Sequence, residues 1–477
     1  DVGALQEVCA SAPLSAADVI DVLTRLAEKS MVQVESGAHG LRYRLLETIR
    51  EYAAEKLDDE GLTSELRDRH LSRYRRLANE AWEAQKHRGA RREHRGLWRE
   101  MDDVRAAISW AAADPEDQLR LVGNLYILWM VYAPAEGFDL ASQLLQGAAG
   151  KSSAGRLSAG YVYSALGGIT GRDDAGFLAP GDLAAIAVAL DDKYLVAHQE
   201  LGMAYFAERQ LVDLQMAENH IRRAVAQFEE IEAGPSLAMA MGSLGSILMQ
   251  RGRPAEARPW IERAVRLAAD VDDPYGAIGA NFHLGHWELE HGTRAAARDA
   301  FLAGLKNVDD GDRLSLTYQV TGVACAIALE DAAFALRLFA ACAQLRAREA
   351  RPLGLPWGPR VDLGVAEARS ALRGNAADQA WQAGEALSAE RLLEEVWARF
   401  PPAGQRTARA PAALSKRELE VAGLVASGMT SRAIAEKLFL SERTVETHLT
   451  HIMTKLSVNS RAQVAAWVAS RGAAEGT

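Results

Sequence analysis

The chain has 477 residues, of which 49% are apolar and 25% are charged. That length allows roughly three domains with cores of their own, which excludes a mini-protein. The share of apolar residues excludes a mainly disordered chain. The 54 Lys and Arg residues face 64 Asp and Glu residues, and a net charge of −10 excludes a protein that coats nucleic acid along its whole length. Residues 401–477 differ in charge, because ten basic residues there face six acidic ones, which leaves −14 for the rest of the chain.

The cysteines and the longest apolar run indicate in which cellular compartment the protein is expected. Cys9, Cys325 and Cys342 are odd in number and lack paired spacing, which favours reduced thiols and a cytoplasmic protein. The longest apolar run, residues 119–133, contains Arg120 and is too short to span a bilayer, so we expect no membrane association. No signal-peptide pattern opens the chain. Because residue 1 is Asp within a helical pattern, we also expect that an upstream part has been lost.

Residues 1–60 predict a small winged-helix-like domain. Apolar residues recur at helical spacing over 16–29 and again over 46–57. Between them, a β-branched stretch at 31–34 and an alternating stretch at 41–45 predict two strands around a glycine-containing turn. The expected order is therefore helix, hairpin, helix.

Residues 61–118 predict a helical connector that is locally basic. Eleven basic residues face four acidic ones between Arg67 and Arg99. A nucleic-acid patch is one interpretation, and the solvated face of amphipathic helices is the other. We favour the second, because no groove-reading motif accompanies the charge and apolar residues recur on the opposite face.

Residues 119–399 predict helical repeats. A small residue follows a large one on the first helix of each unit, and small and large residues recur at fixed offsets on the second helix, which lets the two helices cross closely. The pattern is tetratricopeptide-like and predicts helix pairs. Its three clearest copies are Leu201-Gly202 with Ala217, Ile221 and Ala224; Leu244-Gly245 with Ala257, Ile261 and Ala264; and Leu284-Gly285 with Ala297, Phe301 and Gly304.

Residues 400–413, rich in proline, predict an extended linker, and residues 414–477 follow it as a separate helical domain. Ser415 and Glu418 can form a capping box at the first helix, Thr430 can cap a short second helix over 431–438, and Ser441 can cap a third helix over 442–456. A fourth helix is expected over 460–470. Two helices joined by a short turn form a helix-turn-helix, and its second helix can enter the DNA major groove.

The residues predicted to contact the DNA backbone are polar or basic and lie at the helix starts or at the edges of this motif. They are Thr430, Ser431, Arg432, Lys437, Ser441, Arg443, Lys455 and Arg461.

The C-terminal segment resembles the LuxR-type DNA-binding domain. The resemblance rests on the stretches LSKRELE (414–420), IAE (434–436), LFLSERTVETH (438–448) and KLSVNSRAQ (455–463). It implies that the third helix is the recognition helix and that Glu446, Thr447 and Thr450 contact bases. Position 446 is often basic in that family, and a Glu there can accept a hydrogen bond from a cytosine amine. The resemblance also implies a dimer on double-stranded DNA with two half-sites.

The rest of the chain is similar to actinobacterial regulators that place a STAND-type ATPase before tetratricopeptide helices and a LuxR-type end. The similarity rests on VLTRLAEKSMV (22–32), YRLLETIREYA (43–53), Arg69-His70 and WQAGEAL (381–387). It implies that the repeats sense a protein partner or a small-molecule effector. The ATPase part is not expected in this chain, because Gly150-Lys151-Ser152 has Leu145 where a P-loop needs glycine, and Leu46 occupies the place of a nucleotide-sensing His.

No metal or catalytic site is expected. His283, His286 and Glu290 share one helical face, but they lack the His-Glu-x-x-His order of a zinc site and fall on the first helix of a repeat. We therefore expect a non-enzymatic protein without cofactors, and ATP or ADP only where an upstream NTPase domain exists.

The sequence as a whole predicts a mainly α protein with a winged-helix remnant, a helical repeat superhelix and a four-helix LuxR-type end. The expected function is sequence-specific transcriptional regulation. Two alternatives stay open: the C-terminal half of a nucleotide-switched STAND ATPase, and a repeat scaffold whose helix-turn-helix contacts protein.

Overall fold

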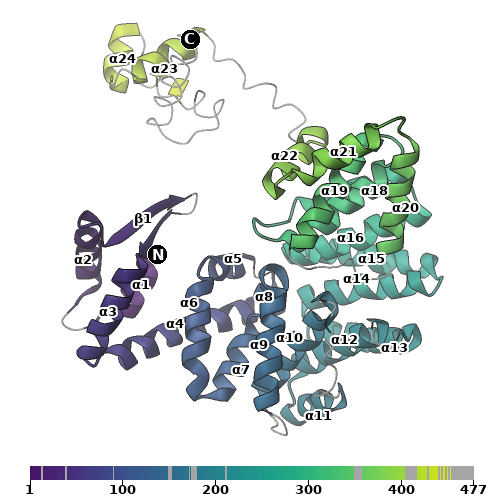
Figure 1. The fold of residues 1–477 in the computed structure, drawn as a ribbon, viewed down its shortest axis with the longest axis horizontal. Coiled ribbons are helices and arrows are strands. Elements are labelled where there is room, and N and C mark those ends of the chain that lie inside the picture. Colours follow the sequence, from purple (N-terminus) through teal and green to yellow (C-terminus); the bar gives the residue numbers. More distant parts are fainter. Residues whose placement is uncertain are drawn as a thin grey trace. The chain divides into compact units, whose positions relative to one another are not determined.

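A computed structural model describes the chain, and Figure 1 shows that it is built almost entirely of helices. The described residues are 1–11, 14–37, 40–89, 91–148, 153–170, 172, 180–209, 212–348, 357–402, 416–426 and 429–438, with positions 441, 444, 445, 448, 449 and 452. The chain divides into two compact units, Asp1–Glu394 and Glu395–Thr477. The predicted mainly α fold class is confirmed.

The first unit begins with the predicted order of helix, hairpin and helix, preceded by one helix that the sequence pattern did not predict. A capping box between Ser15 and Asp18 starts the second helix, with the Asp18 N–H donating to Ser15 Oγ at 3.2 Å. The two strands pair antiparallel, with Val32 opposite Leu45. The elements are α1 (Val2–Cys9), α2 (Ala16–Glu28), β1 (Val32–Gly37), β2 (Gly40–Leu45) and α3 (Glu47–Asp59).

Helix α3 does not bury the apolar side that its sequence spacing suggests. Tyr52 is 55% exposed, Leu46 before the helix is 42% exposed, and none of the residues of α3 is buried. Spacing alone identifies a possible packing face, but burial also needs a partner. The main contact of α3 in the described part of the chain is with the next helix, α4 (Thr63–His87), which leaves most of this face open.

The connector is a set of helices whose arginines pair with carboxylates on other elements. Arg73 and Arg76 both bind Glu7 of α1, and Arg75 binds Asp117. The opposite side of α4 is apolar and buried, as the amphipathic interpretation predicted. The other helices of the predicted connector are α5 (Arg91–Arg99), α6 (Met101–Trp110), a 3₁₀ turn (Ala111–Ala113) and the start of α7 (Pro115–Asn124). Helices α8 (Tyr126–Tyr132) and α9 (Pro134–Gly147) follow in the region predicted as repeats.

The repeat region is a series of helices in which consecutive helices pack as pairs, and the predicted pairs are all present. They are α12 (Lys193–Arg209) with α13 (Leu214–Glu230), α14 (Gly234–Gln250) with α15 (Pro254–Asp270), and α16 (Pro274–His291) with α17 (Arg294–Leu305). The flanking helices are α10 (Ala154–Thr170), α11 (Pro180–Leu190), α18 (Arg313–Ile327), α19 (Ala332–Arg348), α20 (Trp357–Ser370), α21 (Ala376–Glu385) and α22 (Ala389–Arg399).

The small residues of the repeat pattern lie where large residues of the paired helix approach. A Cβ atom added to Gly245 would lie 2.3 Å from the Ile261 side chain, and one added to Gly285 would lie 2.7 Å from the Phe301 ring. Both large side chains are fully buried. Gly202 differs, because an added Cβ would meet nothing closer than Tyr161 at 4.0 Å. Close helix crossing therefore explains the glycine in two of the three repeats.

The first unit also closes on itself, because early helices contact late ones. Helix α4 contacts α14, and α8 contacts α18. The Trp98 ring stacks on the Tyr132 ring, with the two centroids 4.7 Å apart. Gly311 lies against both rings and has a left-handed backbone conformation, with φ of +93°. Arg95 pairs with Asp310 at 3.1 Å across the same junction. Contacts of this kind join segments that are far apart in the chain.

In the regions that the structure describes, no helix combines the length and the apolar character needed to cross a membrane.

Candidate nucleic-acid interface

The described residues of the second unit comprise the end of α22, helices α23 and α24, and single helical positions beyond them. Helix α23 (Lys416–Ala426) and helix α24 (Ser431–Leu438) correspond to the first two predicted helices. Thr430 caps α24, since the Ala433 N–H donates to its Oγ1 at 3.3 Å. Ser441 caps the next turn, where the Thr444 N–H donates to its Oγ at 3.1 Å, and residues 444, 445, 448, 449 and 452 are helical. Thr430 and Ser441 thus occupy the predicted cap positions, whereas the predicted cap Ser415 lies outside the described residues.

An apolar core joins these three helical segments. Val421 from α23, Ile434 from α24, and Val445 and Ile452 from the third segment are fully buried in one cluster. Their spacing on the third segment follows the helical period that the sequence predicted. The other members are Ala422, Val425, Ala435 and Leu449. The third segment is therefore held by one face.

Arg417 also ties the first helix to the end of the second. Its guanidinium donates to the Leu438 carbonyl at 2.7 Å and pairs with Glu420 at 2.7 Å. This bond satisfies one of the carbonyls that a helix end leaves without an intrahelical partner. The sequence analysis did not single out Arg417, and a basic residue in the first turn of α23 gives little signal of a contact 21 residues away.

The predicted DNA-contacting residues divide into described and undescribed positions. Thr430, Lys437 and Ser441 are exposed, and Ser431 is partly buried. Arg432 lies in α24, but its side chain is not described. Six predicted contacts lie outside the described residues, so their placement stays a prediction: Arg443, Glu446, Thr447, Thr450, Lys455 and Arg461.

A group of two histidines and a glutamate in the first unit, which shares one helical face, is packed among other side chains: His283, His286 and Glu290. His286 packs against the Trp357 ring with centroids 4.5 Å apart, and its Nε2 lies 3.5 Å from Glu290 Oε1. Burial lowers the pKa of His286 to about 3 and that of His283 to about 4. Across the described ranges, no group of three or more His, Cys, Asp or Glu side chains is placed to hold a metal ion.

Comparison with known proteins gives the C-terminal end a family. Residues 412–468 match the family described as bacterial regulatory proteins, luxR family. The match spans the described three-segment core and the predicted base-contacting positions. The chain therefore carries a luxR-family helix-turn-helix at its C-terminal end.

Similar proteins are named as regulators. HTH-type transcriptional regulators of Mycobacterium bovis and Mycobacterium tuberculosis are 35% identical over 137 residues, which is 29% of this chain and 15% of each relative. The oxygen regulatory protein NreC of Staphylococcus aureus is 57% identical over 51 residues, 11% of this chain and 24% of NreC. The alignments thus span less than a quarter of the length of each of these relatives. Together with the family match, they support DNA-binding transcriptional regulation.

Among solved structures, a circular tandem repeat protein with a novel repeat topology aligns with 96% of this chain and 94% of its own. The TM-score is 0.17 and the identity is 12%, so this likeness supports no conclusion about the fold or the function.

Proposed function

We propose that the chain is a sequence-specific transcriptional regulator in which the C-terminal helix-turn-helix reads the DNA major groove and the helical repeats sense a partner or ligand. The luxR-family match over 412–468, on a segment whose described residues form a three-part helical core, is the observation that carries this proposal. Catalysis forms no part of it.

Base reading is assigned to the third helix. Its described apolar residues, Val445, Leu449 and Ile452, are buried, and the helical period assigns Glu446, Thr447 and Thr450 to other sides of the same helix. Small polar side chains can bond to base edges in the major groove. Phosphate contacts are assigned to the basic residues Lys437, Arg443, Lys455 and Arg461.

A dimer on two half-sites accounts for the low charge of this domain. Residues 414–477 contain eight basic and six acidic residues, so the net charge is only +2. Because counterion release by phosphate contacts supplies much of DNA affinity, one such domain should bind weakly. Two linked domains bind with a higher effective concentration, so control of pairing by the repeats would control occupancy.

The test measures how the full chain binds DNA. Duplexes selected from a random-sequence library are compared with an unselected duplex by fluorescence anisotropy at several salt concentrations. We expect Thr447→Ala and Thr450→Ala to change sequence preference, with a loss of about 1–3 kcal/mol on the selected duplex. We expect Lys455→Ala to weaken binding to both duplexes alike and to lower the salt slope by about 1.

Two outcomes would contradict the proposal. Equal effects of all three substitutions on every duplex would remove the assignment of base contacts. A DNA affinity that does not fall with salt would favour the rival function, in which the helix-turn-helix contacts protein, since phosphate contacts make affinity salt-dependent.

A further inference from the structure

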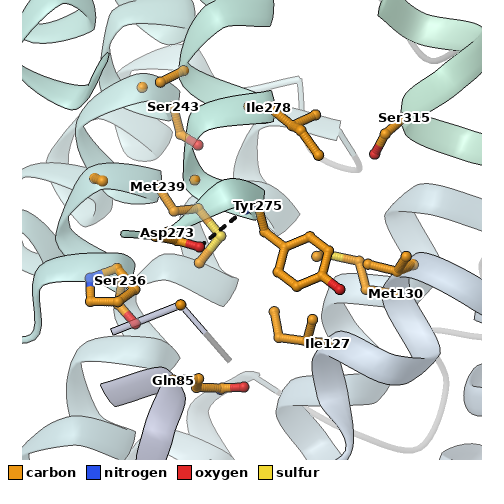
Figure 2. A pocket seen from close by; sticks show the side chains of 18 of the residues that line it. Gln85, Ile127, Met130, Ser236, Met239, Ser243, Asp273, Tyr275, Ile278 and Ser315 are labelled. Carbon is orange, nitrogen blue, oxygen red and sulfur yellow. Dashed lines mark hydrogen bonds between the residues drawn. The ribbon is translucent and has the colours of Figure 1, made fainter. Parts of the chain in front are cut away.

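The first unit contains a partly open cavity that the sequence pattern did not reveal. Its volume is about 250 Å³, and its walls come from α4, α8, α12, α14, α16 and the start of α18. Figure 2 shows side chains from these helices around one space, with Gln85 and Ile127 on one side and Met239 and Ser243 on the other. The cavity thus lies where the early helices meet the repeat helices.

Most of the cavity wall is apolar. Ile127 and Met130 line it from α8, Met239 from α14, and Tyr275 and Ile278 from α16. Methionine side chains are flexible and polarisable, so they adapt to flat aromatic surfaces. For scale, a buried apolar cavity of about 150 Å³ accommodates benzene. A volume of 250 Å³ therefore suits a molecule of about two fused rings.

A few polar groups interrupt this wall, and two of their atoms lack partners. His198 Nε2 lies 3.0 Å from Ser236 Oγ, which uses one ring nitrogen. His198 Nδ1 and Gln85 Oε1 are buried and have no hydrogen-bond partner in the described structure. A buried polar atom without a partner costs free energy, so a ligand that bonds to it gains affinity. Because the Gln85 amide oxygen is an acceptor, a ligand that bonds to it must carry a hydrogen-bond donor.

Few charged groups line the cavity. Burial lowers the pKa of His198 to about 3 and that of His283 to about 4, so both are neutral at pH 7. The Asp273 carboxylate accepts the Tyr275 N–H at 3.1 Å at the start of α16, a bond that Figure 2 marks. Arg88 is exposed and pairs with Glu93 at 2.7 Å. The Asp273 carboxylate is already hydrogen-bonded and would repel an anion, and Arg88 already has a counter-charge, so a charged ligand would lose hydration without gaining a free partner.

We propose that this cavity binds an uncharged, largely apolar small molecule of about two fused rings that carries one hydrogen-bond donor. Gln85 accepts the donor, and Met130, Met239 and Tyr275 contact the apolar body.

Such a ligand contacts both sides of the junction in the first unit. Gln85 and Met130 come from the early helices, whereas Met239 and Ile278 come from the repeat helices. A ligand that contacts both sides favours their closed arrangement in proportion to its differential affinity. That this binding changes the DNA affinity rests on the proposed function, in which the repeats sense an effector.

The first test measures binding without DNA. The probe is 2-naphthol, with naphthalene as the analogue that lacks a donor and naphthalene-2-sulfonate as the charged analogue, each titrated into the full chain by calorimetry. Gly279→Phe places a ring in the cavity, and an added Cβ at Gly279 meets nothing within 4 Å. Gly147→Phe is the matched control, because Gly147 is also helical and equally open but does not line the cavity.

The expected results follow from the shape and from the Gln85 acceptor. Gly279→Phe should weaken 2-naphthol binding at least about tenfold, whereas Gly147→Phe should leave it unchanged. Gln85→Leu should weaken 2-naphthol about threefold to tenfold and leave naphthalene unchanged. The cavity assignment is overturned if 2-naphthol does not bind, if the sulfonate binds as well, or if both phenylalanine variants bind alike.

The second test adds DNA and separates the two proposals. The affinity for a selected duplex is measured with and without saturating 2-naphthol in the wild type and in Gly279→Phe. A change of at least about threefold in the wild type alone supports coupling. If 2-naphthol binds and the DNA affinity is unchanged, the coupling is overturned while the cavity assignment holds. If the chain binds 2-naphthol but no DNA, the proposed function fails instead.

Discussion

Two basic stretches of this chain differ in how their basic residues are used. Residues 67–99 carry eleven basic and four acidic residues, a net +7, whereas residues 414–477 carry a net +2. Yet the luxR-family match falls on the second stretch, and arginines of the first, such as Arg73 and Arg75, bind carboxylates on neighbouring helices. Local charge is therefore a weaker guide to a nucleic-acid interface than the motif that presents it.

The largest expected effect comes from breaking the core of the second unit. Ile434 is fully buried in that core, so Ile434→Asp should unfold this unit, because a buried unpaired carboxylate costs several kcal/mol. DNA affinity should fall by at least about 100-fold. Leu419→Asp is the matched control, since Leu419 is 40% exposed and the added charge is the same.

Calorimetry of the full chain checks this result. The transition of the first unit should stay in place in both variants, because the two units are compact bodies of their own. Equal DNA binding by the two variants would contradict the role assigned to the core.

The next largest effect is on stability, and it should differ between glycines at equivalent positions of two repeats. Gly285→Ala should destabilise the first unit by about 1–3 kcal/mol, because the new methyl group would meet the buried Phe301 ring. Gly202→Ala should be neutral or stabilising, since alanine favours helices and the site is open. Denaturant unfolding measures both. Similar losses in the two variants would show that helix crossing is not what requires the glycine.

The stability of the first unit is expected to fall with acid by an amount similar to the effect of Gly285→Ala. His94 is fully buried, neither of its ring nitrogens has a partner among the described residues, and burial lowers its pKa to about 3. Below pH 6.5 the unfolded chain binds a proton that the folded chain does not, so stability falls as the pH drops towards 3. The contribution of His94 is at most about 1.4 kcal/mol per pH unit.

The substitution His94→Phe isolates this contribution. It keeps an aromatic ring beside Tyr275, whose ring centroid lies 6.4 Å away, and removes the titrating group. Stability measured by urea unfolding at pH 7 and at pH 5 should depend less on pH in the variant. An unchanged pH dependence would refute the assignment.

The smallest effect concerns the basic connector itself. Arg75→Gln and Arg76→Gln remove two charges from the most basic stretch, but these side chains are 45% and 47% exposed and form surface ion pairs. Each substitution should cost at most about 1 kcal/mol of stability. DNA affinity should stay the same when it is measured by anisotropy at low salt. A loss of DNA affinity would revive the interpretation of this stretch as a nucleic-acid patch.

Sequence patterns predicted the features that depend on nearby residues. The glycine and aromatic offsets predicted the helix pairs, because paired helices are consecutive in the chain and their packing rules are local. The cap residues Thr430 and Ser441 were predicted for the same reason, since each bonds to a backbone N–H three residues later.

The closure of the first unit was not predictable in this way. The contacts of α4 with α14 and of α8 with α18 depend on how small rotations add up over many helices, which no local spacing records. The cavity arises from that closure, and Gln85 reads in the sequence as an ordinary helix residue. For the same reason, spacing marked a packing side on α3 but gave no sign that its neighbours leave most of it exposed.

The closure also sets an order of events during synthesis. Tyr132 and Asp309, whose side chains meet across the junction, are separated by 177 residues. At typical translation rates, the first of them waits about 10–35 s for the second to leave the ribosome. During that time the junction surfaces of α4 and α8 face solvent or chaperones. The cavity is complete only after α18 has been made, so a nascent chain should be unable to respond to an effector until that point.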